Sequence, residues 1–173
     1  SLEEGELIRT EDVERALFQI HDLRGIVATS SFGPGAAAGT ADLTIRVSPG
    51  KKLDANLDFD ANGSVYTGIH RIGGGVDGNS LLGLGELINV RASNAIDGNL
   101  RFARASALVP VGPWGTKVGA AYSELKYRLG TPAFNALKVN GAAAVVSLIA
   151  IHPVIRSRNT NLLVIGQHDK RKF

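Results

Sequence analysis

The chain has 173 residues, 19 basic and 16 acidic side chains, a net charge of +3, and no cysteine or methionine. The lack of cysteine excludes a disulfide scaffold, a thiolate zinc site and a cysteine nucleophile, and the small net charge does not indicate nucleic-acid binding. The longest nearly apolar stretch, residues 141–151, is shorter than the roughly 18 to 20 residues of a membrane-spanning helix. Because the chain lacks a methionine to start translation, we expect it to be an internal piece or processed product of a longer protein.

A helix is predicted near the N-terminus. Thr10 is a good N-cap residue, and acidic residues follow it in the first turn, near the positive end of the helix dipole. Apolar residues then recur at helical spacing, namely Val13, Ala16, Leu17 and Ile20. This stripe predicts an amphipathic helix over residues 11–22, which Gly25 ends.

Two β segments follow, over residues 26–32 and 41–47, joined by a turn-rich stretch of glycine and proline. A helix followed by two strands is a small α+β module, and 48 residues are few for an independent core. We therefore expect residues 1–48 to be part of a module whose first strand lies upstream.

From Lys51 onward the helical pattern is replaced by strand alternation. Residues 52–60 alternate without a break between apolar and polar side chains, and Asn62-Gly63 follows as a hairpin turn signal. Further β segments are predicted at residues 65–72, 83–91, 100–108, 117–128, 142–151 and 161–167. Turn chemistry separates them at residues 77–79, 97–99, 110–115, 130–132 and 152–153. About seven strands without an intervening helix predict an antiparallel up-and-down sheet and exclude a βαβ architecture.

The pattern alone leaves open which face of this sheet meets water. A soluble barrel turns its apolar side chains inward, and a membrane barrel turns them toward lipid. Charged residues in mid-strand, which a dry core would penalise, and aromatics near strand ends favour the membrane barrel. The charges are Asp54, Asp58, Arg104 and Glu124, and the aromatics are Phe59, Tyr66, Trp114, Tyr127 and Phe134.

Several short motifs, taken in order, resemble a known family. They are residues 42–47, 60–64, 66–68, Asn79 with 82–86, 110–112 with 115–116, 122–123, 127–130 and 152–158. In this order they resemble the last strand of a POTRA module and the first strands of the barrel in two-partner secretion transporters. These are the haemolysin/haemagglutinin activation and secretion proteins of Gram-negative outer membranes. The chain departs from the family at Arg24, usually proline, at Ala61, and at Glu86, usually aspartate.

The resemblance implies a mainly β fold. Residues 1–48 would be a partial POTRA-like module in the periplasm, and residues 49–173 the N-terminal part of a transmembrane β-barrel of sixteen strands. It further implies type V secretion, in which the pore exports one large unfolded exoprotein of adhesin or haemolysin type through a bilayer of outer-membrane lipid. A barrel-assembly factor of the same superfamily, a pore or adhesin translocator without chaperone function, and a soluble ligand-binding β-barrel remain open as rivals.

The module offers the most promising binding surface. A strand at a sheet edge accepts an extended chain by main-chain pairing, and the POTRA modules of the family are thought to hold the exoprotein in this way. The candidate residues for binding the exoprotein are Ala16, Ile20, Ile26, Ala28, Ser30 and Phe32. The polar face of residues 52–60 supplies the candidate lumen-facing residues Asp54, Asn56 and Asp58.

No catalytic, cofactor or metal site is predicted, and no nucleic-acid partner. Gly73, Gly75 and Gly78 formally match a dinucleotide-binding pattern, but no helix follows, so a glycine-rich periplasmic turn is the preferred interpretation. The four histidines are scattered. Residues 170–172 are interpreted as the start of an exposed loop. Arg156 and Arg158 are interpreted as a solvated turn, with contacts to substrate or lipid headgroups as the alternative.

Overall fold

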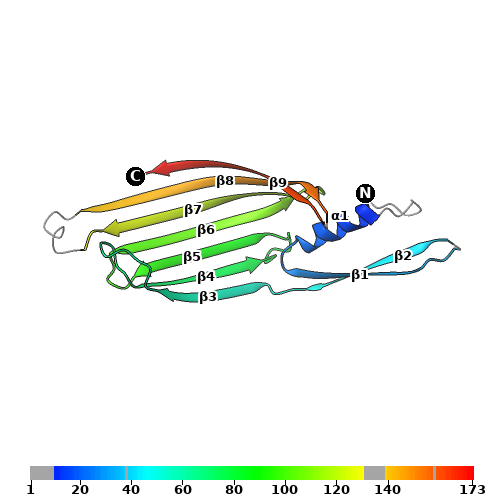
Figure 1. Cartoon of the computed structure of the whole chain (residues 1–173), viewed down its shortest axis with the longest axis horizontal. Coiled ribbons are helices and arrows are strands. Elements are labelled where there is room, and N and C mark those ends of the chain that lie inside the picture. Colours follow the sequence, from blue (N-terminus) through cyan, green and yellow to red (C-terminus); the bar gives the residue numbers. More distant parts are fainter. Residues whose placement is uncertain (1–9, 38, 131–138, 158) are drawn as a thin grey trace.

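The computed structural model describes residues 10–37, 39–130, 139–157 and 159–173 (Figure 1). These ranges contain the helix α1 (Thr10–His21) and nine β-strands. The strands are β1 (Ile26–Pro34), β2 (Ala41–Pro49), β3 (Leu53–Asp60), β4 (Arg71–Asn79), β5 (Leu87–Ala95), β6 (Leu100–Val111), β7 (Thr116–Arg128), β8 (Asn140–Arg156) and β9 (Asn161–Lys172). Within the described residues, no helix is both long and apolar enough to span a membrane.

The N-terminal elements are a helix and a hairpin. α1 matches the predicted helix to within one residue at each end, and Gly25, with a φ of +77°, makes the turn into β1. β1 pairs with β2 in an antiparallel register that runs from Ile26 opposite Pro49 to Pro34 opposite Ala41. The hairpin extends past the helix (Figure 1), and α1 lies against β1.

The remaining strands form one antiparallel sheet of seven strands in the order β3-β4-β5-β6-β7-β8-β9. Each strand therefore pairs with its neighbour in sequence, as the up-and-down prediction requires. The ends of β4, β6 and β8 and the starts of β5, β7 and β9 lie at the end of the sheet that carries α1 (Figure 1). The ends of β3, β5 and β7 and the starts of β4, β6 and β8 lie at the opposite end, which we call the distal end.

One predicted strand was placed wrongly. Residues 65–72 were expected to be extended, and the glycines at 73, 75 and 78 to form a turn, whereas these glycines lie inside β4. A Cβ at Gly73 would lie 2.5 Å from Asp58 Oδ2, and one at Gly75 would lie 3.0 Å from Asn56 Oδ1. The glycines make room for larger polar side chains on β3, which is a known use of glycine within a strand.

The neighbouring boundaries shift for the same reason. Asp77 and Gly78, predicted as a break, belong to β4, and β5 begins at Leu87 rather than at residue 83. The Asn62-Gly63 signal falls in a longer connection of residues 61–70, where the Gly63 N–H donates to the Ile69 carbonyl at 2.9 Å. Residues 130–132 lie partly, and Phe134 wholly, outside the described residues.

Two features near the C-terminus were also predicted wrongly. The break expected at His152-Pro153 lies inside β8, where a bulge between Pro153 and Ile155 absorbs the irregularity. Residues 170–172, interpreted as a loop, continue β9 opposite Val146, Val145 and Ala144. Pairing with β8 holds this basic segment extended, although its composition resembles that of a loop.

The β4–β5 turn is built around a buried carboxylate. Glu86 is 2% exposed, and its two carboxylate oxygens accept the N–H groups of Leu82 at 2.7 Å and Leu84 at 3.1 Å. Its carbonyl accepts the N–H of Ser80 at 2.7 Å. A buried carboxylate is tolerated only when such donors satisfy it, so Glu86 determines the shape of residues 80–86.

We expect Glu86→Gln to weaken this turn in a pH-dependent way. The N–H donors, that of Leu82 first, hold the pKa of Glu86 below its ordinary value of 4.5. Because the folded pKa is the lower one, the stabilisation is complete above the unfolded pKa and is lost as the pH falls through the folded pKa. The difference in urea midpoint between wild type and variant should therefore be largest near neutral pH and should disappear at acidic pH. A difference independent of pH would contradict this role.

Candidate functional site

The two faces of the seven-stranded sheet differ in polarity and in exposure. On one face, Leu57 is 90% exposed and Leu148 is 58% exposed, whereas on the other, Ala121 is 7% and Ser147 is 8% exposed. The register confirms that Leu148 and Ala120 share one face, opposite to that of Ala121 and Ser147. The more buried face is the polar one, so the sheet curls toward its polar side. We call this the inner face and the apolar, exposed side the outer face.

The three predicted lumen residues occupy the inner face at the β3 edge. Asp54, Asn56 and Asp58 lie opposite Asp77, Gly75 and Gly73 of β4. Asp77 accepts a hydrogen bond from Asn89 Nδ2 at 2.5 Å. The structure therefore brings these acidic and amide groups into one patch, while Asp54 also pairs with Lys51 at 2.7 Å.

Basic side chains continue the inner face beyond this patch. Gly75 lies opposite Arg91, and Arg91 lies directly opposite Arg104. A Cβ at Gly75 would lie 3.1 Å from Arg91 Cγ, so the glycine also makes room for the arginine. Neither arginine forms a salt bridge within the described residues. The inner face thus carries acidic and basic groups side by side, which a dry core would not tolerate.

One aromatic expected at a membrane interface lies on the inner face instead. Tyr127 is opposite Gly141, and its ring occupies the space that a Cβ at Gly141 would take, 2.7 Å from the ring atoms. Phe59 and Tyr122 lie on the outer face and are 65% and 48% exposed. Trp114, in the β6–β7 turn, is 68% exposed.

The predicted binding strand has one backbone edge turned away from β2. The Gly50 N–H donates to the Gly25 carbonyl at 2.9 Å, and the Gly35 N–H donates to Thr40 at 3.0 Å. In an antiparallel ladder, alternate residues bond to the partner strand. The odd-numbered residues from Gly25 to Gly35 therefore direct their backbone N–H and C=O groups toward β2. The even-numbered positions, which include all four candidate residues of β1, therefore direct their N–H and C=O groups to the opposite edge. These are Ile26, Ala28, Ser30 and Phe32.

This edge is partly occupied by the chain itself. His21 Nε2 donates to the Ala28 carbonyl at 2.7 Å, and Ala28 is 6% exposed. Ser30 is exposed, and Phe32 is 58% exposed. Within the described residues, β1 pairs only with β2. The accessible part of the edge therefore lies at Ser30 and Phe32.

The helix that carries the other two candidates lies against β1. Ala16 and Ile20 are half-buried, and Ile26 is also half-buried. α1 covers the first half of β1 and leaves the hairpin tip uncovered (Figure 1). Along β1, the buried Ala28 therefore differs from the exposed positions at Ser30 and Phe32.

A junction that sequence reasoning missed joins the helix to the sheet. Arg156, at the end of β8, donates from Nη2 to Asp22 Oδ1 at 2.7 Å and from Nε to Asp22 Oδ2 at 3.0 Å. Its guanidinium also lies over the Phe18 ring, 5.2 Å from the centroid, and bonds Asn161. Arg156 is 27% exposed and Asp22 is 35% exposed. The interpretation of Arg156 as a solvated turn was therefore wrong, and Arg158 lies outside the described residues.

Backbone and glycine contacts complete the junction. Lys117 Nζ donates to the Asp22 carbonyl at 3.1 Å. A Cβ at Gly25 would lie 2.7 Å from the Asn79 carbonyl oxygen, and one at Gly85 would lie 3.1 Å from Leu23. An open hollow of about 410 Å³ lies among these residues, lined by Lys51, Asn79 and Lys117 as well as residues 21–26. No sequence pattern could indicate the Asp22–Arg156 pair, because 134 residues separate the partners.

The described residues offer no metal centre. Nowhere within them do three or more histidine or acidic side chains come together in a group that could hold a metal ion. The site therefore consists of a strand edge, a mixed-charge inner face and the junction between them. Such surfaces suit contact with a polypeptide.

A family comparison identifies the class to which this arrangement belongs. Residues 39–172 match the model of the family ShlB, described as haemolysin secretion/activation protein ShlB/FhaC/HecB. This match covers most of the chain, so the chain belongs to this family. The resemblance predicted from the short motifs is thereby confirmed, as is the mainly β, barrel-type fold.

Curated relatives and solved structures agree with this assignment. The chain is 27% identical over 157 residues to heme/hemopexin transporter protein HuxB from Haemophilus influenzae strains, covering 91% of this chain and 28% of the relative. CdiB from Escherichia coli superposes with a TM-score of 0.76 at 23% identity, over 97% of this chain and 32% of the other. CdiB from Acinetobacter baumannii gives 0.66 at 18% identity, over 98% and 33%. The chain thus spans about a third of the length of these proteins.

We expect Arg156→Gln to loosen the junction without unfolding the sheet. The variant loses the bidentate ion pair and the stacking over Phe18, so the segment of residues 22–25 should be cleaved several-fold faster in limited proteolysis. Arg171→Gln is a matched control, because Arg171 pairs with Asp169 on its own strand at 3.2 Å and joins no separate elements. Equal cleavage of the two variants would contradict a role for Arg156 in holding the helix.

Proposed function

We propose that this chain is the junction and first wall of an outer-membrane pore that exports a large partner exoprotein by two-partner secretion. The observation that carries the proposal is the arrangement of the faces of β3 to β6, where the outer face is mainly apolar and exposed and the charged side chains of Asp54, Asp58, Arg91 and Arg104 lie on the inner face. A soluble barrel has the reverse arrangement. The family match also supports an export pore. We propose that the whole protein, of which this chain is a part, exports the exoprotein.

In this pore the inner face is the wall along which the exported chain passes. Asp54, Asn56 and Asp58 line the wall at the β3 edge, and Arg91 and Arg104 follow on the next strands. Hydrated groups of both signs offer an unfolded chain few apolar contacts. The exoprotein consequently slides past without a strong binding site. No covalent chemistry and no cofactor enter this scheme.

The helix and hairpin form the periplasmic capture element, as the end of a POTRA-like module over residues 1–48, with the barrel following from residue 49. An incoming extended segment of the unfolded exoprotein adds to the β1 edge by main-chain hydrogen bonds. Pairing begins at Ser30 and Phe32, where the edge is open, and continues to Ala28 and Ile26 once His21 releases the Ala28 carbonyl. Ala16 and Ile20 supply apolar contacts beside the strand.

The junction gives this capture element a fixed direction. The Asp22–Arg156 ion pair holds α1 at the same end of the sheet as the turns after β4, β6 and β8. The captured segment is therefore presented at the entrance of the pore. The relatives named as heme/hemopexin transporter proteins support a transport role for the pore.

The full-length protein refolded in detergent should migrate differently on gels before and after heating. A closed membrane barrel stays folded in the detergent of the gel until heat opens it, and the compact and unfolded forms differ in mobility. Electrophoresis of heated and unheated samples makes the measurement. Identical mobility combined with solubility in plain buffer would instead indicate the soluble ligand-binding barrel.

The β1 edge is tested by Ser30→Pro in the full-length protein. Proline removes the N–H that faces the open edge, and it is tolerated there because that group does not bond β2. Loss of one main-chain bond, on the order of 1 kcal/mol, should weaken binding of an unfolded exoprotein segment about fivefold. Ser30→Ala is the matched control, because it keeps the N–H and should bind like wild type.

Heat-dependent mobility should be the same in both Ser30 variants, which shows that the barrel is intact. Equal affinity of the proline and alanine variants would exclude strand addition at this edge. A barrel-assembly factor would instead bind barrel strands of other proteins, so a competing barrel-strand peptide distinguishes the two functions.

A further inference from the structure

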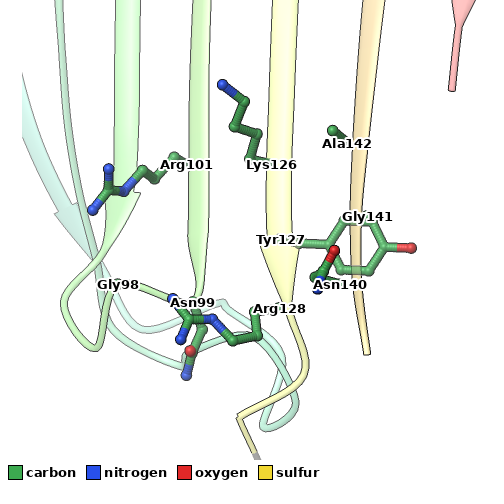
Figure 2. Close-up of a pocket in the computed structure, with 9 residues that line it drawn as sticks. All are labelled: Gly98, Asn99, Arg101, Lys126, Tyr127, Arg128, Asn140, Gly141 and Ala142. Atoms are coloured by element: carbon green, nitrogen blue, oxygen red, sulfur yellow. The ribbon is translucent and has the colours of Figure 1, made fainter. Parts of the chain in front are cut away.

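A cluster of basic side chains lies at the distal end of the sheet. Arg101 projects from the start of β6, and Lys126 and Arg128 project from the end of β7 (Figure 2). They line an open hollow of about 360 Å³ that also includes Asn99 and Asn140. We call these three cationic residues the distal basic cluster. It lies at the opposite end of the sheet from the helix and its junction.

The register places the whole cluster on the outer face. Arg101 is directly opposite Lys126, and Lys126 is directly opposite Ala142 of β8. Arg128 is two residues beyond Lys126 on the same strand, so it shares that face. Tyr127, between them, turns to the inner face over Gly141 (Figure 2). The cations therefore face outward from the curled sheet.

Two of the three charges are not neutralised within the described residues. Lys126 forms a salt bridge with Glu124 at 2.6 Å, which offsets its charge. Arg101 and Arg128 form no salt bridge in the described part of the chain, and both are exposed. Two guanidinium groups, each a planar fork of donors, thus line the same hollow as Asn99 and Asn140. This chemistry suits the oxygens of a phosphate group.

The outer face becomes apolar directly beyond the cluster. From the Arg101–Lys126–Ala142 row toward the junction end, the outer positions of β6, β7 and β8 are alanine, valine, leucine and tyrosine, apart from Glu124 and, at the junction end itself, Thr116 and His152. They are Ala103, Ala105, Ala107, Val109, Val118, Ala120, Tyr122, Ala144, Val146, Leu148 and Ala150. A change from cations to an aromatic and aliphatic band marks the level where a bilayer's headgroups meet its acyl chains.

We propose that the distal basic cluster binds the phosphate groups of phosphorylated glycolipid headgroups in the outer leaflet of the membrane. The guanidinium groups of Arg101 and Arg128 hold the phosphate oxygens, and the acyl chains lie along the apolar band below. The adjoining band favours a lipid over a free phosphate ion, since a small anion gains nothing from apolar neighbours. The inference rests on the proposed function, because that function places the distal end outside the cell.

The test uses the full-length barrel and the double variant Arg101→Gln/Arg128→Gln. Its binding to vesicles containing diphosphorylated lipid A should fall roughly twentyfold, on the order of fivefold for each cation lost near an anionic surface. Vesicles of the dephosphorylated lipid should bind wild type as weakly as they bind the double variant. Arg104→Gln is the matched control, because Arg104 lies on the same strand but faces inward, and it should bind like wild type.

Three outcomes overturn the inference. They are unchanged lipid binding by the double variant, an equal loss in the Arg104 control, or displacement of the lipid by millimolar inorganic phosphate, which would indicate a small-anion site. A cysteine at Ala61, in the distal connection after β3, separates this result from the proposed function. If a membrane-impermeant reagent does not label it in intact cells, the proposed orientation fails, whereas labelling with unchanged lipid binding refutes the lipid site alone.

Discussion

The two-residue repeat of the extended strand is the constraint on which the rest of this structure depends. Side chains alternate between the two faces of a strand, and backbone groups alternate between its two edges. In β3 to β6 the first alternation separates a mainly polar inner face from a mainly apolar outer face. In β1 the second alternation directs the backbone groups of Ser30 and Phe32 away from β2. One geometric rule thus defines both the proposed wall of the pore and the edge at which we propose that the captured chain binds.

A sheet that turns polar groups inward requires room for them, and glycine supplies it. Asp58 and Asn56 occupy the space that side chains at Gly73 and Gly75 would take. At the junction end the constraint is different. Asp22 and Arg156 form a partly buried, bidentate pair, and the aromatic ring of Phe18 packs under the guanidinium. Charge pairing and stacking together fix the helix on the sheet, where a single exposed ion pair would contribute little.

How far the sequence predicts this structure depends on the range of each interaction. Residues 52–60 alternate strictly, so β3 was predicted to within a residue, and the helix was predicted from its apolar stripe in the same way. The glycines of β4 misled the prediction, because locally they look like a turn and only their partners on β3 explain them. Glu86 gave no local sign that it would organise a turn. The Asp22–Arg156 junction could not be predicted, since no local pattern connects positions 134 residues apart.

The candidate site divides along the same line. Asp54, Asn56 and Asp58 were predicted to share a face, because side chains two residues apart on a strand point to the same side. The candidates Ile26, Ala28, Ser30 and Phe32 are the even-numbered residues of β1. The sequence does not say whether the backbone groups of the even-numbered residues point toward β2 or toward the open edge. The answer depends on the hydrogen bond from Gly50 to Gly25, which starts the ladder and so determines every bond after it. Shifting that first bond by one residue would turn the open edge toward β2, and the same four residues of β1 could then receive no partner strand.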